Sequence, residues 1–276
     1  MNLAIEVRGQ GPPILCLHGH PGSSQAMRVF TEPLSAQFRT IAPDLRGYGG
    51  SRVRAPFVMS DHLDDLEHLL NQQGIEQCFL LGWSLGGILA LELALRNPDR
   101  YRAIALIGTA ARPRGAHPQV TVLDLACTGI AALLNQLRPG WPWNIETFGV
   151  RSLFRWLIYQ QTPTPYRYLA QYGTAAYWRT SRQATQALQT ALRQGYDRLD
   201  ALDNLTLPCV MLAGEHDVHI TAASSQETAQ RLPNCDWHCF ADTAHLLPFE
   251  QPEIMNERLM AWFLAQAGQH NSNRFI

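Results

Sequence analysis

Apolar and polar positions follow two different periods along this chain. Short apolar runs bounded by glycine, proline or polar residues have the length of buried strands, and apolar residues spaced three or four apart indicate helices. Strands that alternate with helices predict an α/β fold with a doubly wound, mostly parallel sheet. We expect strands over 3–8, 14–17, 39–43, 78–82, 101–107, 208–213 and 236–240, and helices within 30–37 and over 60–72, 85–96, 222–231 and 252–265.

Two of the expected helix ends depend on particular residues. Ser60 is expected to cap the helix over 60–72, with Asp61 close to the positive end of the helix dipole. The polar residues 268–276 follow the last helix and are expected to be frayed.

The segment over 112–203 interrupts the alternation, because it has helical patterns and no strand-like run. It holds four of the seven tryptophans and six of the eight tyrosines, and proline-rich pieces separate its helices. Because it follows a sheet strand directly, we interpret it as a helical cap over the strand ends, inserted into a core made of 1–111 and 204–276. The alternative is a helical second domain with no role in substrate binding.

Composition excludes several classes of function. The 276 residues carry a formal net charge of −1, which argues against a nucleic-acid-binding surface, and all 22 basic residues are arginine. The six cysteines lack metal-binding spacing, which indicates a reducing compartment and a cytoplasmic protein. No run approaches the about 18 apolar residues of a membrane span, so no membrane partner is expected. We expect a monomer or a weak homodimer.

The sequence Gly82-Trp83-Ser84-Leu85-Gly86 lies between a buried strand and a buried helix. A serine at such a sharp corner projects above the sheet edge, and bulky residues two positions away on either side would clash. The start of the helix directs free N–H groups and a positive dipole end toward the group that the serine attacks. This context predicts that Ser84 is a nucleophile.

A serine hydroxyl needs a base within hydrogen-bonding reach, and the base needs an orienting group. His245 follows the last strand, and Asp217 follows the strand over 208–213. The order serine, acid, histidine is the one that this kind of sheet requires. Glu215 and Asp242 are nearby acids and stay open as alternatives to Asp217.

Negative charge develops on the substrate carbonyl during such an attack, and backbone N–H groups usually stabilise it. The expected donors are Leu85, at the start of the helix, and His20, in the loop after the first buried strand. His216 and His219 could imitate a metal-binding pair, but two histidines on one loop without a third ligand are a weak signal. We expect no metal and no organic cofactor.

With these motifs the chain resembles the α/β-hydrolase family over nearly its whole length. The motifs are His18-Gly19-x-Pro21, Asp44-x-Arg46-Gly47-x-Gly49, Gly82-x-Ser84-x-Gly86-Gly87, Gly214-x-x-Asp217 and Ala244-His245.

Different parts of the chain resemble different subfamilies of this family. The residues around Ser84 are similar to those of pimeloyl-carrier-protein methyl ester esterases. His20-Pro21 resembles epoxide hydrolases and haloalkane dehalogenases, which attack with aspartate, and this resemblance predicts a cis His20–Pro21 peptide. Related carbon–carbon hydrolases carry asparagine where this chain has Trp83. The expected function is therefore a serine hydrolase that cleaves a small carboxylic ester through an acyl-enzyme. The alternatives are a carbon–carbon hydrolase, a proline iminopeptidase-like amidase, and a non-enzymatic ligand receptor or interaction module.

The expected cap is strongly basic. It has nine arginines against two acids between residues 112 and 196, a balance of +7. Arg151 and Arg155 are one helical turn apart and are expected to share an outward face. They would capture an anionic ester or an acidic carrier protein that presents an acyl chain; the alternative is a merely solvated face. With Trp83, Trp141 and Trp143 they are the candidate substrate-binding residues.

Overall fold

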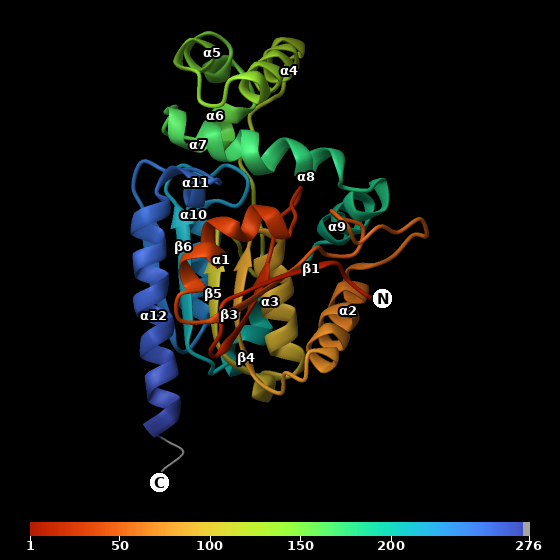
Figure 1. The fold of residues 1–276 in the computed structure, drawn as a ribbon, viewed down its shortest axis with the longest axis vertical. Coiled ribbons are helices and arrows are strands. Elements are labelled where there is room, and N and C mark those ends of the chain that lie inside the picture. The colour runs from red at the N-terminus through yellow and green to blue at the C-terminus, as the bar shows by residue number, and fades with distance from the viewer. Residues whose placement is uncertain (273–276) are drawn as a thin grey trace.

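The computed structural model describes residues 1–272 of the chain and contains a seven-stranded sheet with helices on both faces (Figure 1). The strand order is β1-β3-β2-β4-β5-β6-β7, and every neighbouring pair is parallel except the edge strand β1, which is antiparallel to β3. The expected fold class is confirmed. The strands are β1 Ile5–Arg8, β2 Pro13–Leu17, β3 Arg39–Pro43, β4 Cys78–Trp83, β5 Tyr101–Ile107, β6 Cys209–Gly214 and β7 Cys235–Phe240.

The helices surround this sheet and also extend beyond its carboxyl edge. They are α1 Arg28–Leu34, α2 Met59–Gln72, α3 Leu85–Arg96, α4 Val122–Leu137, α5 Pro142–Thr147, α6 Phe154–Leu157, α7 Pro163–Tyr168, α8 Thr174–Trp178, α9 Arg182–Arg193, α10 Ala222–Arg231, α11 Leu247–Glu250 and α12 Pro252–Ser272, with short 3-10 turns at Ser24–Met27, Pro98–Arg100, Gly149–Arg151 and Leu199–Asn204 and a π-helical turn at Leu169–Gly173.

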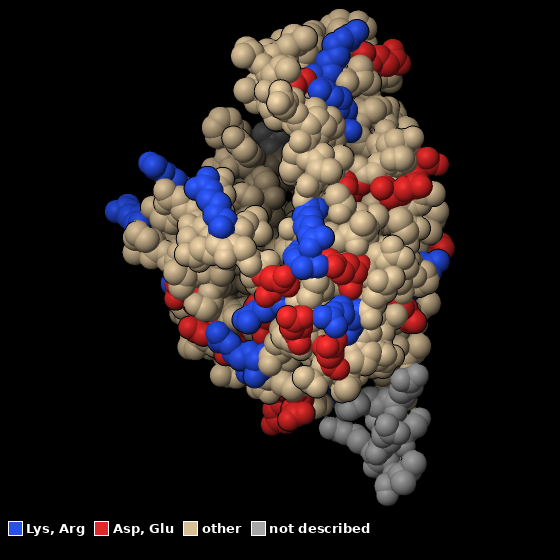
Figure 2. Space-filling model, turned by 180° about the vertical axis from the view of Figure 1, so that it is seen from behind, with Lys and Arg blue, Asp and Glu red and all other residues tan. Residues whose placement is uncertain are grey.

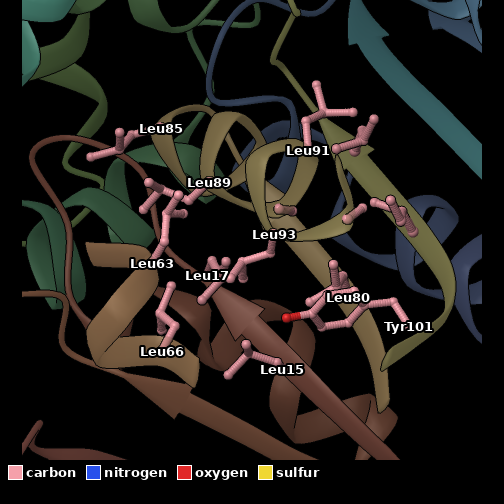
Figure 3. Packing of buried hydrophobic residues seen from close by; sticks show 14 of the residues in the cluster. Leu15, Leu17, Leu63, Leu66, Leu80, Leu85, Leu89, Leu91, Leu93 and Tyr101 are labelled. Atoms are coloured by element: carbon pink, nitrogen blue, oxygen red, sulfur yellow. The ribbon is translucent and has the colours of Figure 1, made fainter. Parts of the chain in front are cut away.

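Alternate residues of the central strands enter two separate hydrophobic layers. Leu15 and Leu80 point into a layer shared with α2, α3 and α10, where Leu66 and Leu89 are fully enclosed (Figure 3). The opposite face of the same strands packs against α1 and α12. Because both faces are covered, the strand sequences read as continuous apolar runs, which is why they could be recognised.

Two expected helix ends are wrong. Helix α2 begins at Met59 rather than after Ser60, because the Asp61 carboxylate accepts the N–H of Val58 at 2.8 Å and satisfies a helix start two residues earlier. Helix α12 continues through residues 268–272, where fraying was expected; Ala265, Gln266 and Ala267, directly before this stretch, favour a helix. Residues 273–276, also expected to fray, lie outside the described part of the chain.

The helices between β5 and β6 form two groups. Helices α4 to α8 lie over the carboxyl ends of the strands, and we call residues 122–178 the lid (Figure 1). Helix α9 instead packs beside α2, with Ala184 buried in the hydrophobic layer of the sheet. The segment expected to be one cap therefore has a part that covers the flank of the core.

Within residues 1–272, no helix has both the length and the apolar composition that crossing a membrane requires.

Candidate active site

The backbone of Ser84 is strained at the corner between β4 and α3. Its dihedrals are φ 54° and ψ −116°, in a region that non-glycine residues rarely adopt. The neighbouring glycines make the corner possible: a Cβ on Gly82 would collide with the backbone of Gly86, and one on Gly86 would collide with the Leu17 carbonyl. The steric requirement expected for this motif is therefore met by the observed packing.

A chain of hydrogen bonds connects three side chains from different loops. The His245 Nε2 atom lies 3.1 Å from the Ser84 Oγ atom, and His245 Nδ1 lies 2.7 Å from Asp217 Oδ2. The other carboxylate oxygen of Asp217 accepts the backbone N–H groups of His219 and Ile220 at 2.7 and 3.0 Å. With Nδ1–H donating to the carboxylate, Nε2 can accept the serine proton.

The environment of Asp217 favours its ionised form. Burial by itself raises the pKa of this carboxyl, but the nearby imidazole of His245 and the two backbone N–H donors outweigh burial and hold the pKa below its ordinary value. A carboxylate that stays charged at neutral pH can fix the orientation of the imidazole and stabilise its protonated form.

Glu215 and Asp242, the alternative acids, lie elsewhere. Both are exposed and form a group with His216, in which one potential ligand atom from each residue lies within 4.8 Å of the others. His219, considered above as a second metal ligand beside His216, is not in this group; its ring packs 5.1 Å from the ring of His245. Within residues 1–272, no hydrogen bond joins the side chains of this exposed group to Asp217, His245 or Ser84.

The loop that follows β2 lies directly beside the nucleophile. A methyl group on Gly19 would come within 3.1 Å of the Ser84 Cβ atom. The next peptide bond, His20–Pro21, is cis, as expected from the sequence. Leu85 is the first residue of α3, where backbone N–H groups have no acceptor within the helix.

Three histidines other than His245 are kept neutral; His18 and His62 are buried, and His219 is half-buried. His18 joins two loops, because its Nδ1 donates to the Gly19 carbonyl at 2.8 Å and its Nε2 accepts the Leu45 N–H at 3.1 Å. Burial lowers the pKa of His18 to about 4. Burial and the proximity of His18 lower the pKa of His62 to about 4, and burial together with neighbouring histidines lowers that of His219 to about 3.

A cavity of about 700 Å³ extends from Ser84 under the lid, and Figure 2 shows the surface hollowed between the lid and the body of the molecule. Among the described residues, no aspartate, glutamate or arginine side chain lines it. Trp83 lines it, as expected of a substrate-binding residue. Trp141 and Trp143 do not; their rings pack on each other with centroids 4.9 Å apart. The wall contributed by α4 consists of Leu125, Thr128, Gly129, Ala132, Leu133, Asn135 and Gln136.

The prediction that Arg151 and Arg155 share an outward helix face is wrong. Ser152 separates a 3-10 turn from α6, and its hydroxyl accepts the Phe154 N–H at 3.1 Å, so the two arginines are not on one helix. Arg151 donates to the Thr147 carbonyl, and Arg155 forms a 2.8 Å ion pair with Asp124. Neither lines the cavity; both make contacts inside the lid.

Glu250 is a buried carboxylate that sequence reasoning missed. One oxygen accepts the N–H of Ala244, next to His245, at 2.7 Å, and the other accepts the N–H groups of Tyr159 and Gln160 at 2.8 and 2.7 Å. Burial raises the pKa of Glu250, although the three N–H donors oppose the increase. The carboxylate thus fastens the histidine loop to the lid.

Further contacts reinforce this connection. The N–H of Leu246 donates to the Leu157 carbonyl at 2.8 Å, and the Gln160 amide donates to the Asp242 carbonyl at 3.0 Å. The only signal in the sequence was an acid at the end of an apolar stretch five residues after the histidine, and that signal does not reveal its partners.

Comparison with known proteins identifies relatives over most of the chain. The family model described as "Alpha/beta hydrolase family" matches residues 14–258. A carboxylesterase of Bacillus subtilis, described as uncharacterized, is 23% identical over 93% of this chain and 81% of its own length. A pimeloyl-[acyl-carrier protein] methyl ester esterase of Nitrosomonas europaea is 27% identical over 91% of this chain and 96% of its own. The solved structure of a thermophilic esterase from Thermogutta terrifontis superposes with a TM-score of 0.71 at 25% identity, covering 96% of this chain and 93% of that one.

The three neutral histidines, His18, His62 and His219, predict acid-sensitive stability. Their pKa values in the folded chain lie below the ordinary 6.5, so between these values the unfolded chain binds more protons than the folded one. The free energy of unfolding is therefore highest above about pH 6.5 and decreases as the pH falls toward the pKa values of the folded chain. At about pH 5 each of these histidines should lower the free energy of unfolding by roughly 2 kcal/mol relative to its value at neutral pH. Thermal unfolding should therefore show a lower Tm at this pH than at neutrality. His62→Phe should weaken the dependence, and the exposed His68→Phe on the same helix should not; equal slopes for both variants would contradict this account.

Replacing Glu250 should disturb catalysis more than substrate binding. Glu250→Gln leaves one or two buried N–H groups facing an amide donor, at a cost of about 1–3 kcal/mol each. We expect a lower Tm and a lower kcat on a soluble ester, with KM changed less, because His245 loses its fixed position. Glu253→Gln, an exposed carboxylate three residues further on, is the matched control. A Glu250→Gln variant with the parent's kcat and Tm would show that this carboxylate does not position the histidine.

Proposed function

The chain belongs to the alpha/beta hydrolase family, and we propose that it is a serine hydrolase that cleaves carboxylic esters. The observation that supports this most is the hydrogen-bonded series from Ser84 through His245 to Asp217, at 3.1 and 2.7 Å. Relatives named as esterases match most of the chain. A nucleophile, a base in contact with it and an acid that orients the base form the arrangement that acyl transfer requires.

The proposed reaction has two halves. The Ser84 oxygen attacks the ester carbonyl while His245 takes the serine proton, and the resulting oxyanion accepts hydrogen bonds from the N–H groups of Leu85 and His20. The tetrahedral intermediate then expels the alcohol, which leaves with the proton from His245, and an acyl-enzyme remains. Water repeats the sequence on this acyl-enzyme, releasing the acid and restoring Ser84. Asp217 holds the imidazole throughout and does not itself take the proton.

The size and the apolar wall of the cavity indicate that it holds a neutral, apolar acyl group of the substrate. Its volume of about 700 Å³ exceeds the needs of a short acyl chain, and its wall includes Leu125, Leu133, Phe154 and Phe249. An acyl chain carried by an acidic protein would fit the same space, as the name of the Nitrosomonas europaea relative suggests. A free carboxylate inside the cavity would be desolvated without a cation, so an anionic group, if the substrate has one, belongs outside.

The other candidates have less support. A proline iminopeptidase-like amidase would need acids to bind the substrate's amino group, and the cavity wall has none among the described residues. The remaining alternatives are a carbon–carbon hydrolase and a non-enzymatic receptor. A receptor would leave p-nitrophenyl esters intact, so their hydrolysis distinguishes the proposal from a receptor. An amidase or a carbon–carbon hydrolase with the same three side chains would also cleave such activated esters; a kcat/KM on a carboxylic ester well above that on the matching amide and the matching ketone distinguishes the proposal from these two.

Removing the nucleophile should abolish the activity. Ser84→Ala should lose hydrolysis of p-nitrophenyl butyrate and covalent labelling by a fluorophosphonate, while its circular dichroism stays that of the parent. The exposed Ser60→Ala, on α2, serves as the matched control and should retain both. If Ser84→Ala were labelled and turned over the ester as the parent does, another residue would be the nucleophile.

Acyl chain length should determine the rate. We expect kcat/KM to rise from the acetate to the octanoate ester by up to about fourfold per methylene, since each buried methylene is worth about 0.8 kcal/mol. A side chain on Gly129 would meet open space in the cavity wall. Gly129→Phe should thus shorten the preferred chain, while Ala126→Phe, on the outer side of the same helix, should not. A flat profile in the parent would contradict the assignment of the cavity.

A further inference from the structure

The lid exposes an unusual amount of apolar surface. Of the nineteen large apolar side chains that are exposed within the described residues, eleven belong to the lid, and six of these are on α4. Val122 is 84% exposed, Leu137 76% and Trp178 78%. Exposed apolar surface of this extent usually marks an interaction site on a globular protein.

Helix α4 presents three faces at helical spacing. The face buried inside the lid is polar or small, with Asp124, Cys127, Ala131 and Asn135. A second face lines the cavity. The third face, which points outward, is apolar throughout and comprises Val122, Leu123, Ala126, Ile130, Leu133 and Leu137, of which Leu133 also reaches the cavity wall. A helix at a protein surface normally has the reverse arrangement, with its apolar side buried.

Hydrogen bonds inside the lid explain why the buried face of α4 is polar, but they do not explain why its outward face is apolar. Asp124 is paired with Arg155, and the Asn135 side chain donates to the Tyr166 carbonyl at 2.7 Å and accepts the Gly140 N–H at 2.9 Å. Among the described lid residues, none covers Leu123 and Leu137 on the other side of α4, which stay 65% and 76% exposed. The sequence therefore places the largest apolar residues where this chain alone does not bury them.

The apolar face adjoins the mouth of the cavity. Leu125, Leu133, Tyr177 and Trp178 are each exposed and also line the cavity. The hollow in Figure 2 is accordingly bordered mainly by uncharged surface, with arginines further out. An acyl chain could pass from this surface into the cavity without being surrounded by water.

Arginines follow the apolar residues directly. Arg138 comes after Leu137 at the end of α4, Arg179 comes after Trp178, and both arginines are exposed. Between residues 112 and 196 there are nine arginines and two acids; Arg155 is paired with Asp124, and Arg112 with Asp197 and Glu227, which leaves seven arginines outside these pairs. Apolar residues flanked by basic ones are typical of helices that lie in the interface of an anionic membrane.

We propose that the outward face of α4, with Trp178, binds the surface of an anionic phospholipid bilayer. The leucines enter the boundary between headgroups and acyl chains, and Arg138 and Arg179 remain at the level of the phosphates. No membrane partner was expected because no segment can span a bilayer, but binding to its surface requires no span. A second copy of the chain fits this face less well, because pairing would bring two basic lids together.

Sedimentation with vesicles tests this proposal without depending on catalysis. The full chain is mixed at low salt with vesicles of phosphatidylcholine alone or of equimolar phosphatidylcholine and phosphatidylglycerol. We expect binding to the anionic vesicles, weaker binding to the neutral ones, and release by salt. The double variant L123S/L137S changes residues outside the cavity wall and should bind at least about tenfold more weakly, since burial of one leucine alone amounts to roughly that factor or more.

Two controls separate the proposal from its alternatives. Ile254→Ser alters an exposed isoleucine on α12, away from the lid, and should bind as the parent does. L123S/L137S should hydrolyse a soluble short ester at the parent's rate, which shows that the fold is intact. Failure of the parent to bind anionic vesicles, or equal binding by L123S/L137S, would overturn the proposal. The proposal would also be overturned if the parent dimerised without vesicles, or bound an acidic protein instead of vesicles, and L123S/L137S abolished that association.

Discussion

The backbone of Ser84 is held at φ 54° and ψ −116° because the chain must turn from β4 into α3 within one residue. That turn is possible only while Gly82 and Gly86 let the strand, the helix and the end of β2 approach one another without side chains between them. Strain of this kind costs of order 1–3 kcal/mol and persists when the surrounding packing enforces it. Two apolar layers of a seven-stranded sheet provide that packing.

The rest of the site follows from the direction of the strands. Because β4, β6 and β7 are parallel, Ser84, Asp217 and His245 all emerge at one edge of the sheet. The lid covers the same edge, and Glu250 joins it to the loop that carries the histidine. The lid and the residue next to His245 are therefore held by the two oxygens of one carboxylate.

What could be predicted from the sequence were features encoded locally. The strands read as apolar runs, and Ser84 and His245 stand at corners whose flanking residues reveal them. Glu250 could not be recognised, because two of its three partners are backbone N–H groups from residues about ninety positions away. The shared face of Arg151 and Arg155 failed for a similar reason: helical spacing does not show that Ser152 ends the turn, nor that Asp124 takes one guanidinium.

The central claim is that Asp217, and no other nearby acid, orients the histidine that activates Ser84. It is tested most directly by comparing kcat of Asp217→Asn with that of Asp242→Asn on one p-nitrophenyl ester. We expect Asp217→Asn to lose roughly 10⁴-fold in kcat, the effect known for the corresponding change in a serine protease triad, and Asp242→Asn to stay close to the parent. A parent-like kcat in Asp217→Asn, with the loss appearing in Asp242→Asn, would contradict the account.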